Sequence, residues 1–345
     1  MARAIGFAIG ENGLVFRERY IFDRARCERP LAELQAGAHW LVLASRQPLY
    51  RAVQQAGRSV ASVLDFYSAM ERGRPVHVCV SLSARSADND LRRLDASLQA
   101  LFGRDVAGWG AGAVMEAATR FAPGLAMRCA GAVTTIELEG LVGLLLTGHE
   151  IRRNNPGAIV LSLDQHRRLL ARSGQLGDVL SVRSQGNGIS ITVGESKFST
   201  QSVDHNSSLV GDARAQVRST VARLQHLAAS HPLSPRARTV LSRALVHQIH
   251  LTDPDRQRAS ELYRLVDAAA DPYQSLLIEP ESTGVVHVWS ISPSTVDLVV
   301  PDVTGRASVH LHGRATTLAR LRELGSDSAG HSTTSDRFKA QLPLE

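Results

Sequence analysis

A strand-turn-strand segment at residues 178–198 constrains the fold of this 345-residue chain more than any other feature. Side chains alternate between the two faces of a strand, so every second residue from position 189 shares one face. The residues on that face are Ile189, Ile191, Val193, Glu195 and Lys197. Charges that continue a buried apolar face are costly unless they are paired or bind a metal. The pattern predicts a β-sheet with a Glu–Lys site at one end of a buried strand.

Residues 178–183 form the preceding strand and enter a turn within residues 184–188. Two registers are open: one puts Asp178 directly opposite Glu195, and the other puts it opposite Lys197 and diagonal to Glu195. Both keep Asp178 on the same face, because a shift of two residues preserves the strand parity. Cross-strand neighbours lie within roughly 5–8 Å. Asp178 and Glu195 can therefore share one Mg²⁺ or Mn²⁺ ion beside Lys197.

The charge of the chain favours a polyanionic partner. The net charge is +6, and residues 151–230 contain ten Arg and Lys against five Asp and Glu, an excess of 10 − 5 = 5. A basic surface suits a phosphate backbone. Only Lys197 and Lys339 are lysines among 39 basic residues. Because arginine supplies nearly every other positive charge, Lys197 is expected to act as a compact ammonium that arginine cannot replace.

These residues resemble the core of the PD-(D/E)XK nuclease superfamily, although Gly177 stands where the name of the family has proline. The resemblance implies that Asp178 and Glu195 hold a divalent metal and that Lys197 is the catalytic lysine. It implies a mixed-sheet, restriction-endonuclease-like α/β core. The activity that it implies is a Mg²⁺-dependent (or Mn²⁺-dependent) deoxyribonuclease, and its partner is DNA.

The helices on either side complete the resemblance. Gln216, on the helix predicted at residues 212–229, matches a glutamine that many members carry after the motif strand. The upstream helix often supplies an acidic metal ligand, for which Glu139 is the first candidate and Glu150 the second. Thr134 and Glu137 have the spacing of a helix-capping box, so Glu137 is assigned to the cap. Arg214 and Arg218, four residues apart on one helix face, are expected to contact DNA phosphates.

The wider layout is similar to nuclease-like regions of bacterial anti-phage proteins. These are DptH-type restriction proteins and relatives that work with HerA-like or FtsK-like ATPases. The chain itself has no phosphate-binding loop and no motor motif, so the resemblance implies a separate ATPase or other defence subunits. Two alternatives stay open: a degenerate nuclease fold that only binds DNA, and an adaptor subunit of such a complex. A homo-oligomer is also left open.

Composition and patterning divide the chain into four expected regions. They are an N-terminal α/β domain at 1–130, the nuclease-like domain at 131–230, a C-terminal α+β region at 231–324 and a flexible tail at 325–345. No apolar run reaches the length of a membrane span, and the three cysteines match no zinc or disulfide spacing, so a cytoplasmic setting is expected.

The remaining motifs predict structure or contacts. His247 and His250 on a helix, and His310 and His312 on a strand, each share a face but lack a third metal ligand in the sequence. The apolar strands expected at 40–44 and 285–291 are candidates for a protein interface, because a basic nuclease face must stay free for DNA.

Overall fold

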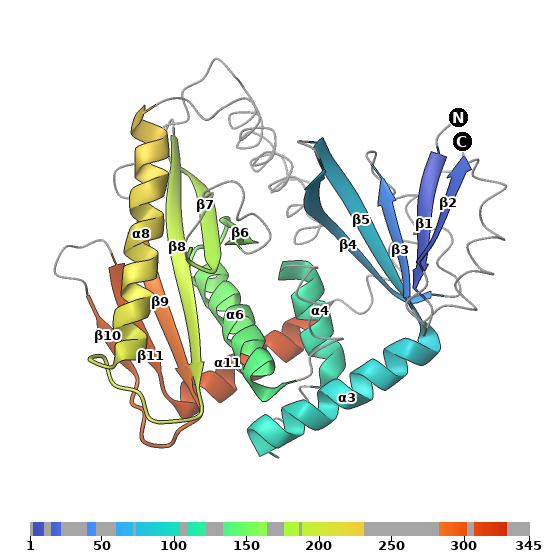
Figure 1. The fold of residues 1–345 in the computed structure, drawn as a ribbon. Coiled ribbons are helices and arrows are strands. Elements are labelled where there is room, and N and C mark those ends of the chain that lie inside the picture. Colours follow the sequence, from blue (N-terminus) through green and yellow to red (C-terminus); the bar gives the residue numbers. More distant parts are fainter. Residues whose placement is uncertain are drawn as a thin grey trace.

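The chain forms two β-sheets with helices packed against them (Figure 1). The computed structural model describes residues 3–9, 15–21, 40–45, 60–71, 74–103, 110–121, 134–163, 176–185, 188–230, 283–301 and 307–329. The sequence also predicts helices at 234–250, which contains His247 and His250, and at 254–270, and both lie outside these residues. No helix among the described residues is both long and apolar enough to cross a membrane.

The N-terminal sheet has five strands in the order β2-β1-β3-β5-β4, and all neighbours are antiparallel. Its strands are β1 (Arg3–Ile9), β2 (Val15–Ile21), β3 (Trp40–Ser45), β4 (Val60–Glu71) and β5 (Arg74–Ser83). The turn signal at residues 11–13 predicts a hairpin, and β1 and β2 do pair, with Ile9 opposite Val15. The apolar periodicity of residues 50–61 predicts a helix, which is wrong at its end: Val60 begins β4, where strand pairing with β5 prevails over the local helical period.

The second sheet has six strands in the order β10-β11-β9-β8-β7-β6. They are β6 (Ile159–Ser162), β7 (Val179–Gln185), β8 (Gly188–Ser199), β9 (Thr283–Ser290), β10 (Leu298–Val300) and β11 (Ala307–His312). The first three are antiparallel to one another, β9 runs parallel to β8, and β11 runs parallel to β9. This mixed sheet and its helices give an α/β fold, as the sequence predicts.

Helices cover both faces of the six-stranded sheet (Figure 1). On one face, α8 (Ser208–Ser230) buries Val210, Val217 and Val221 against apolar residues of β8, β9 and β11. The other face carries α6 (Thr135–Asn154). Three more helices pack around α6; they are α3 (Ala84–Phe102), α4 (Ala111–Phe121) and α11 (Arg314–Ala329). The central strands β8 and β9 therefore present one side chain to α8 and the next to α6.

The expected helix start at α6 is confirmed. The hydroxyl of Thr134 accepts a hydrogen bond from the backbone N–H of Glu137 at 3.3 Å, and the carboxylate of Glu137 accepts one from the backbone N–H of Thr134, also at 3.3 Å. These two bonds satisfy backbone donors that have no partner within the helix. Glu137 is thereby committed to the cap.

Three expectations about the C-terminal third are wrong. Strands β9 to β11 complete the same sheet as β6 to β8, so residue 230 does not divide two separate sheets. Residues 285–290 are buried inside that sheet, between β8 and β11, and cannot form the expected exposed interface. Residues 325–329, which were expected in the flexible tail, belong to α11, which packs against α4 and α6.

Candidate active site

Four of the residues that the sequence singles out lie on the α8 face of the six-stranded sheet. Asp178 directly precedes β7, Glu195 and Lys197 belong to β8, and Gln216 belongs to α8. Val179 pairs with Gly194, so Asp178 is next in line and lies opposite Glu195. Of the two registers left open by the sequence, the first is therefore correct.

Hydrogen bonds connect Lys197 to Glu195 and Gln216, and connect Asp178 to the backbone of β8. The Lys197 ammonium donates to Glu195 Oε1 at 2.8 Å and to Gln216 Oε1 at 3.5 Å. Across the hairpin, the backbone N–H of Ser196 donates to Asp178 Oδ2 at 3.0 Å. One carboxylate is thus fixed by a backbone donor and the other by an ammonium.

Burial makes the Glu195–Lys197 pair energetically demanding. The side chain of Glu195 is 1% exposed, whereas that of Lys197 is 26% exposed. Taking an ion pair out of water is unfavourable unless the charges are close and well hydrogen-bonded. The 2.8 Å contact meets that condition, with Lys197 at the solvent side of the pair.

The backbone before Asp178 is held by α8. Thr220 is fully buried, and its Oγ1 accepts a hydrogen bond from the N–H of Gly177 at 2.9 Å. The same hydroxyl donates to the carbonyl of Gln216 at 2.9 Å, and the Gln216 amide donates to the carbonyl of Leu176 at 3.4 Å. Two residues of α8 therefore fasten the start of β7.

Glycine at position 177 is required by close packing. A Cβ there would come within 2.7 Å of Val193 Cγ1 and 3.1 Å of the Gly194 carbonyl. A larger residue would push the strand start away from β8 and move Asp178 with it. This contact explains why position 177 is a glycine.

The expected third acidic ligand is not brought into this group. Glu139 is a half-buried residue of α6, which covers the opposite face of the sheet, and burial raises the pKa of its carboxyl. Among the side chains that the structure describes, no group of three histidines, cysteines or carboxylates is arranged to hold a metal. Two opposed carboxylates remain as the oxygen donors.

Glu150, the second candidate, has a structural role. Its carboxylate bonds Arg153 at 3.0 Å and Arg320 of α11 at 2.7 Å. Burial opposes its ionisation, but the hydrogen bonds and charges of the two arginines outweigh burial and lower the pKa of Glu150. This ion-pair network joins α11 to the C-terminal end of α6.

The two arginines expected at DNA differ in exposure. Arg218 is exposed on α8, whereas Arg214 is half-buried and its Nε atom is buried. Arg218 is therefore the more available of the two for a phosphate.

Sequence reasoning missed Thr220 and the buried His287. Thr220 lies one helical turn after Gln216, but a threonine within a helix has no signal of its own. His310 and His312 do share a face of β11, as expected, and the structure adds His287 from β9. His287 Nδ1 and His312 Nε2 are 2.9 Å apart, and the His312 ring stacks on Trp289 with centroids 3.8 Å apart.

The geometry of the Asp178, Glu195, Lys197 and Gln216 cluster is the basis for any functional statement about this chain. Comparison with family models, with curated proteins and with solved structures finds no match.

Proposed function

We propose that this chain is a metal-dependent DNA nuclease that hydrolyses phosphodiester bonds at Asp178, Glu195 and Lys197. The proposal rests on one observation: two acidic residues face each other across neighbouring strands, and a lysine bonds the buried one at 2.8 Å. Buried charged side chains that are gathered in this way are candidates for a functional site.

The donor set fits a hard divalent cation. Mg²⁺ takes few carboxylates and completes its shell with water and substrate phosphate oxygens, so Asp178 and Glu195 suffice as protein ligands. A bound cation of this kind polarises a phosphodiester and lowers the pKa of an attacking water. The backbone bond from Ser196 holds Asp178 Oδ2 in position, which favours a preformed site.

Lys197 has the reach to act on the substrate. An ammonium has three hydrogen-bond donors. Two of them point to Glu195 and Gln216, and the side chain is partly exposed. A third donor can therefore meet a water or a phosphate oxygen and offset charge that develops in the transition state.

The order of elements supports the same proposal. Helix α6, three antiparallel strands and helix α8 follow each other along the chain, with Asp178 directly before the second strand and Glu195 on the third. This is the layout that the nuclease resemblance implies. With it we propose the wider role: a subunit of a bacterial anti-phage complex in which a HerA-like or FtsK-like ATPase supplies DNA.

A second candidate is a degenerate nuclease fold that binds DNA or acts as an adaptor. It is favoured by the lack of a three-ligand group among the described residues and by the direct pairing of Lys197 with Glu195. In that case the pair has become a structural ion pair.

Cleavage of plasmid and linear DNA in Mg²⁺, Mn²⁺ and EDTA decides between the two. A nuclease cuts in either metal, stops in EDTA and loses activity in Lys197→Ala, while Arg322→Ala on the exposed side of α11 cuts like the wild type. A protein that binds DNA but cuts none in any metal is the degenerate form.

A further inference from the structure

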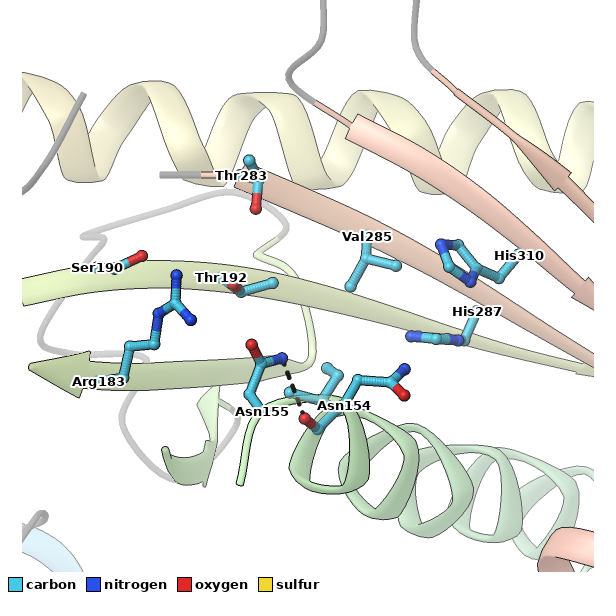
Figure 2. A pocket seen from close by; sticks show the side chains of 10 residues that line it. Asn154, Asn155, Arg183, Ser190, Thr192, Thr283, Val285, His287 and His310 are labelled. Carbon is cyan, nitrogen blue, oxygen red and sulfur yellow. Dashed lines mark hydrogen bonds between the residues drawn. The ribbon is translucent and has the colours of Figure 1, made fainter. Parts of the chain in front are cut away.

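A cavity of about 400 Å³ lies on the α6 face of the six-stranded sheet, where α6 ends (Figure 2). Strands β7, β8, β9 and β11 supply its floor, and the last residues of α6 supply a wall. Thr192 points into it, whereas its neighbours Ile191 and Val193 pack on the α8 side. The sheet therefore separates this cavity from Asp178 and Glu195, and its volume is within the range of small-molecule sites, roughly 300–1,000 Å³.

The lining is polar and has one sign of charge. Of the described residues that line the cavity, only Ile151 and Val285 are apolar, none is a carboxylate, and Arg183 has the one formal charge. Figure 2 shows the Arg183 guanidinium reaching towards Ser190 and Thr192, on the side of the cavity where the Asn155 amide also lies. Guanidinium groups pair best with phosphate or carboxylate groups.

The wall at the end of α6 offers the opposite chemistry. The Asn155 amide donates to the carbonyl of Ile151 at 3.1 Å, and the Asn154 amide donates to Glu150 at 3.2 Å. Each bond uses one of the two N–H groups of its amide, and the carbonyl oxygen of each side chain can accept a hydrogen bond from a ligand. A helix C-terminus carries partial negative charge, which also favours hydrogen-bond donors.

The histidines on the floor contribute hydrogen bonds without charge. Burial, with the nearby His312 and His310, holds the pKa of His287 well below its usual range, and burial also lowers the pKa of His310. Glu150 does not make the cavity acidic, because Arg153 and Arg320 bond its carboxylate. The cavity thus combines one arginine with uncharged hydrogen-bonding groups.

We propose that this cavity binds a small organic anion, with its phosphate or carboxylate against Arg183 and its hydroxyl or amino groups donating to Asn154 and Asn155. A ligand that has only the anionic group, or only the hydrogen-bond donors, would bond either Arg183 or the two asparagines but not both. The proposal is independent of nuclease activity, since no residue of the Asp178–Lys197 cluster lines the cavity.

Isothermal titration of the full chain in EDTA tests this with four probes. Adenosine 5′-monophosphate and gluconate combine an anion with donors, adenosine has the donors alone, and inorganic phosphate has the anion alone. We expect one of the first two to bind with a sub-millimolar dissociation constant, and adenosine and phosphate to bind at least tenfold more weakly. Which of the first two binds distinguishes an organic phosphate from a carboxylate.

Variants then assign the binding to this cavity. Arg183→Gln should weaken the bound probe at least tenfold, whereas Arg322→Gln, an equal charge change on exposed α11, and Lys197→Ala should leave it unchanged. Circular dichroism checks that Arg183→Gln is folded. Failure of both anions to bind at millimolar concentration, or unchanged binding to Arg183→Gln, would overturn the proposal whether or not the chain cuts DNA.

Discussion

Replacing Lys197 of the Glu195–Lys197 pair should lower the free energy of unfolding far more than replacing Glu195. Lys197→Met keeps most of the side-chain volume but leaves Glu195, which is 1% exposed, as a buried charge without its ammonium. Removing one partner of a buried ion pair costs about 3–5 kcal/mol, mostly from the stranded charge. Glu195→Gln leaves the ammonium instead, which is 26% exposed and still within 3.5 Å of Gln216 Oε1, so roughly 1 kcal/mol is expected.

The same reasoning predicts rescue by metal. A ligand present at one hundred times its dissociation constant stabilises the folded state by about 2.7 kcal/mol. If Glu195 and Asp178 bind Mg²⁺, the cation replaces the missing ammonium, and its binding to Lys197→Met should be tighter than to the wild type. The stability gained on adding Mg²⁺ should therefore be larger in Lys197→Met than in the wild type, and small in Glu195→Gln.

Urea unfolding followed by circular dichroism, in EDTA and in Mg²⁺, measures both effects. Arg218→Met is the matched control, since it removes a long cation from the exposed side of α8 and should change the free energy of unfolding by less than about 0.5 kcal/mol. The reasoning is refuted if Lys197→Met in EDTA is no less stable than Arg218→Met, or if Mg²⁺ stabilises Glu195→Gln as much as Lys197→Met.

Three further predictions follow from other contacts. Thr220→Val removes the acceptor of the Gly177 N–H and should cost about 1–3 kcal/mol and speed amide exchange at Gly177, while Thr220→Ser should do neither. Burial lowers the pKa of His312 to about 4, so its contribution to stability is complete above the unfolded value near 6.5 and is lost as the pH drops towards 4. Unfolding measured across that range should show a loss that is smaller by about 3 kcal/mol in His312→Gln, and the rest comes from His287 and His310, whose pKa values are also lowered. Arg218→Ala should weaken DNA binding equally for all sequences and reduce its salt slope by about 1, and Arg214→Ala should do so less; a changed sequence preference in either variant would contradict phosphate contact.

Alternation along the hairpin allowed the sequence to predict which side chains share a face of the sheet. Strand parity placed Asp178, Glu195 and Lys197 on one face, and the structure selects the register that puts the two carboxylates opposite each other. Gln216 could be placed because it lies on a helix that directly follows the hairpin. Predictions of this kind require only the geometry of residues that are close together in the sequence.

Long-range contacts could not be predicted in the same way. Nothing near Thr220 indicates that it meets Gly177, 43 residues earlier. The apolar run at 285–291 is equally typical of an exposed interface strand and of a central strand, and only its parallel pairing with β8 and β11 settles that it is buried. The position of Glu139 relative to the site depends on the direction in which α6 crosses the sheet. No local sequence pattern determines that direction.

The most direct test of the account is a crystal of the protein soaked in Mn²⁺ and measured at a wavelength where manganese scatters anomalously. The account predicts one strong anomalous peak between the carboxylates of Asp178 and Glu195, at about 2.0–2.3 Å from their oxygens, and no peak there in Glu195→Gln. The soak uses a manganese concentration that saturates cleavage-competent nucleases. If Lys197 is then still bonded to Glu195 and no manganese lies beside it, the claim that this cluster is a metal site is contradicted.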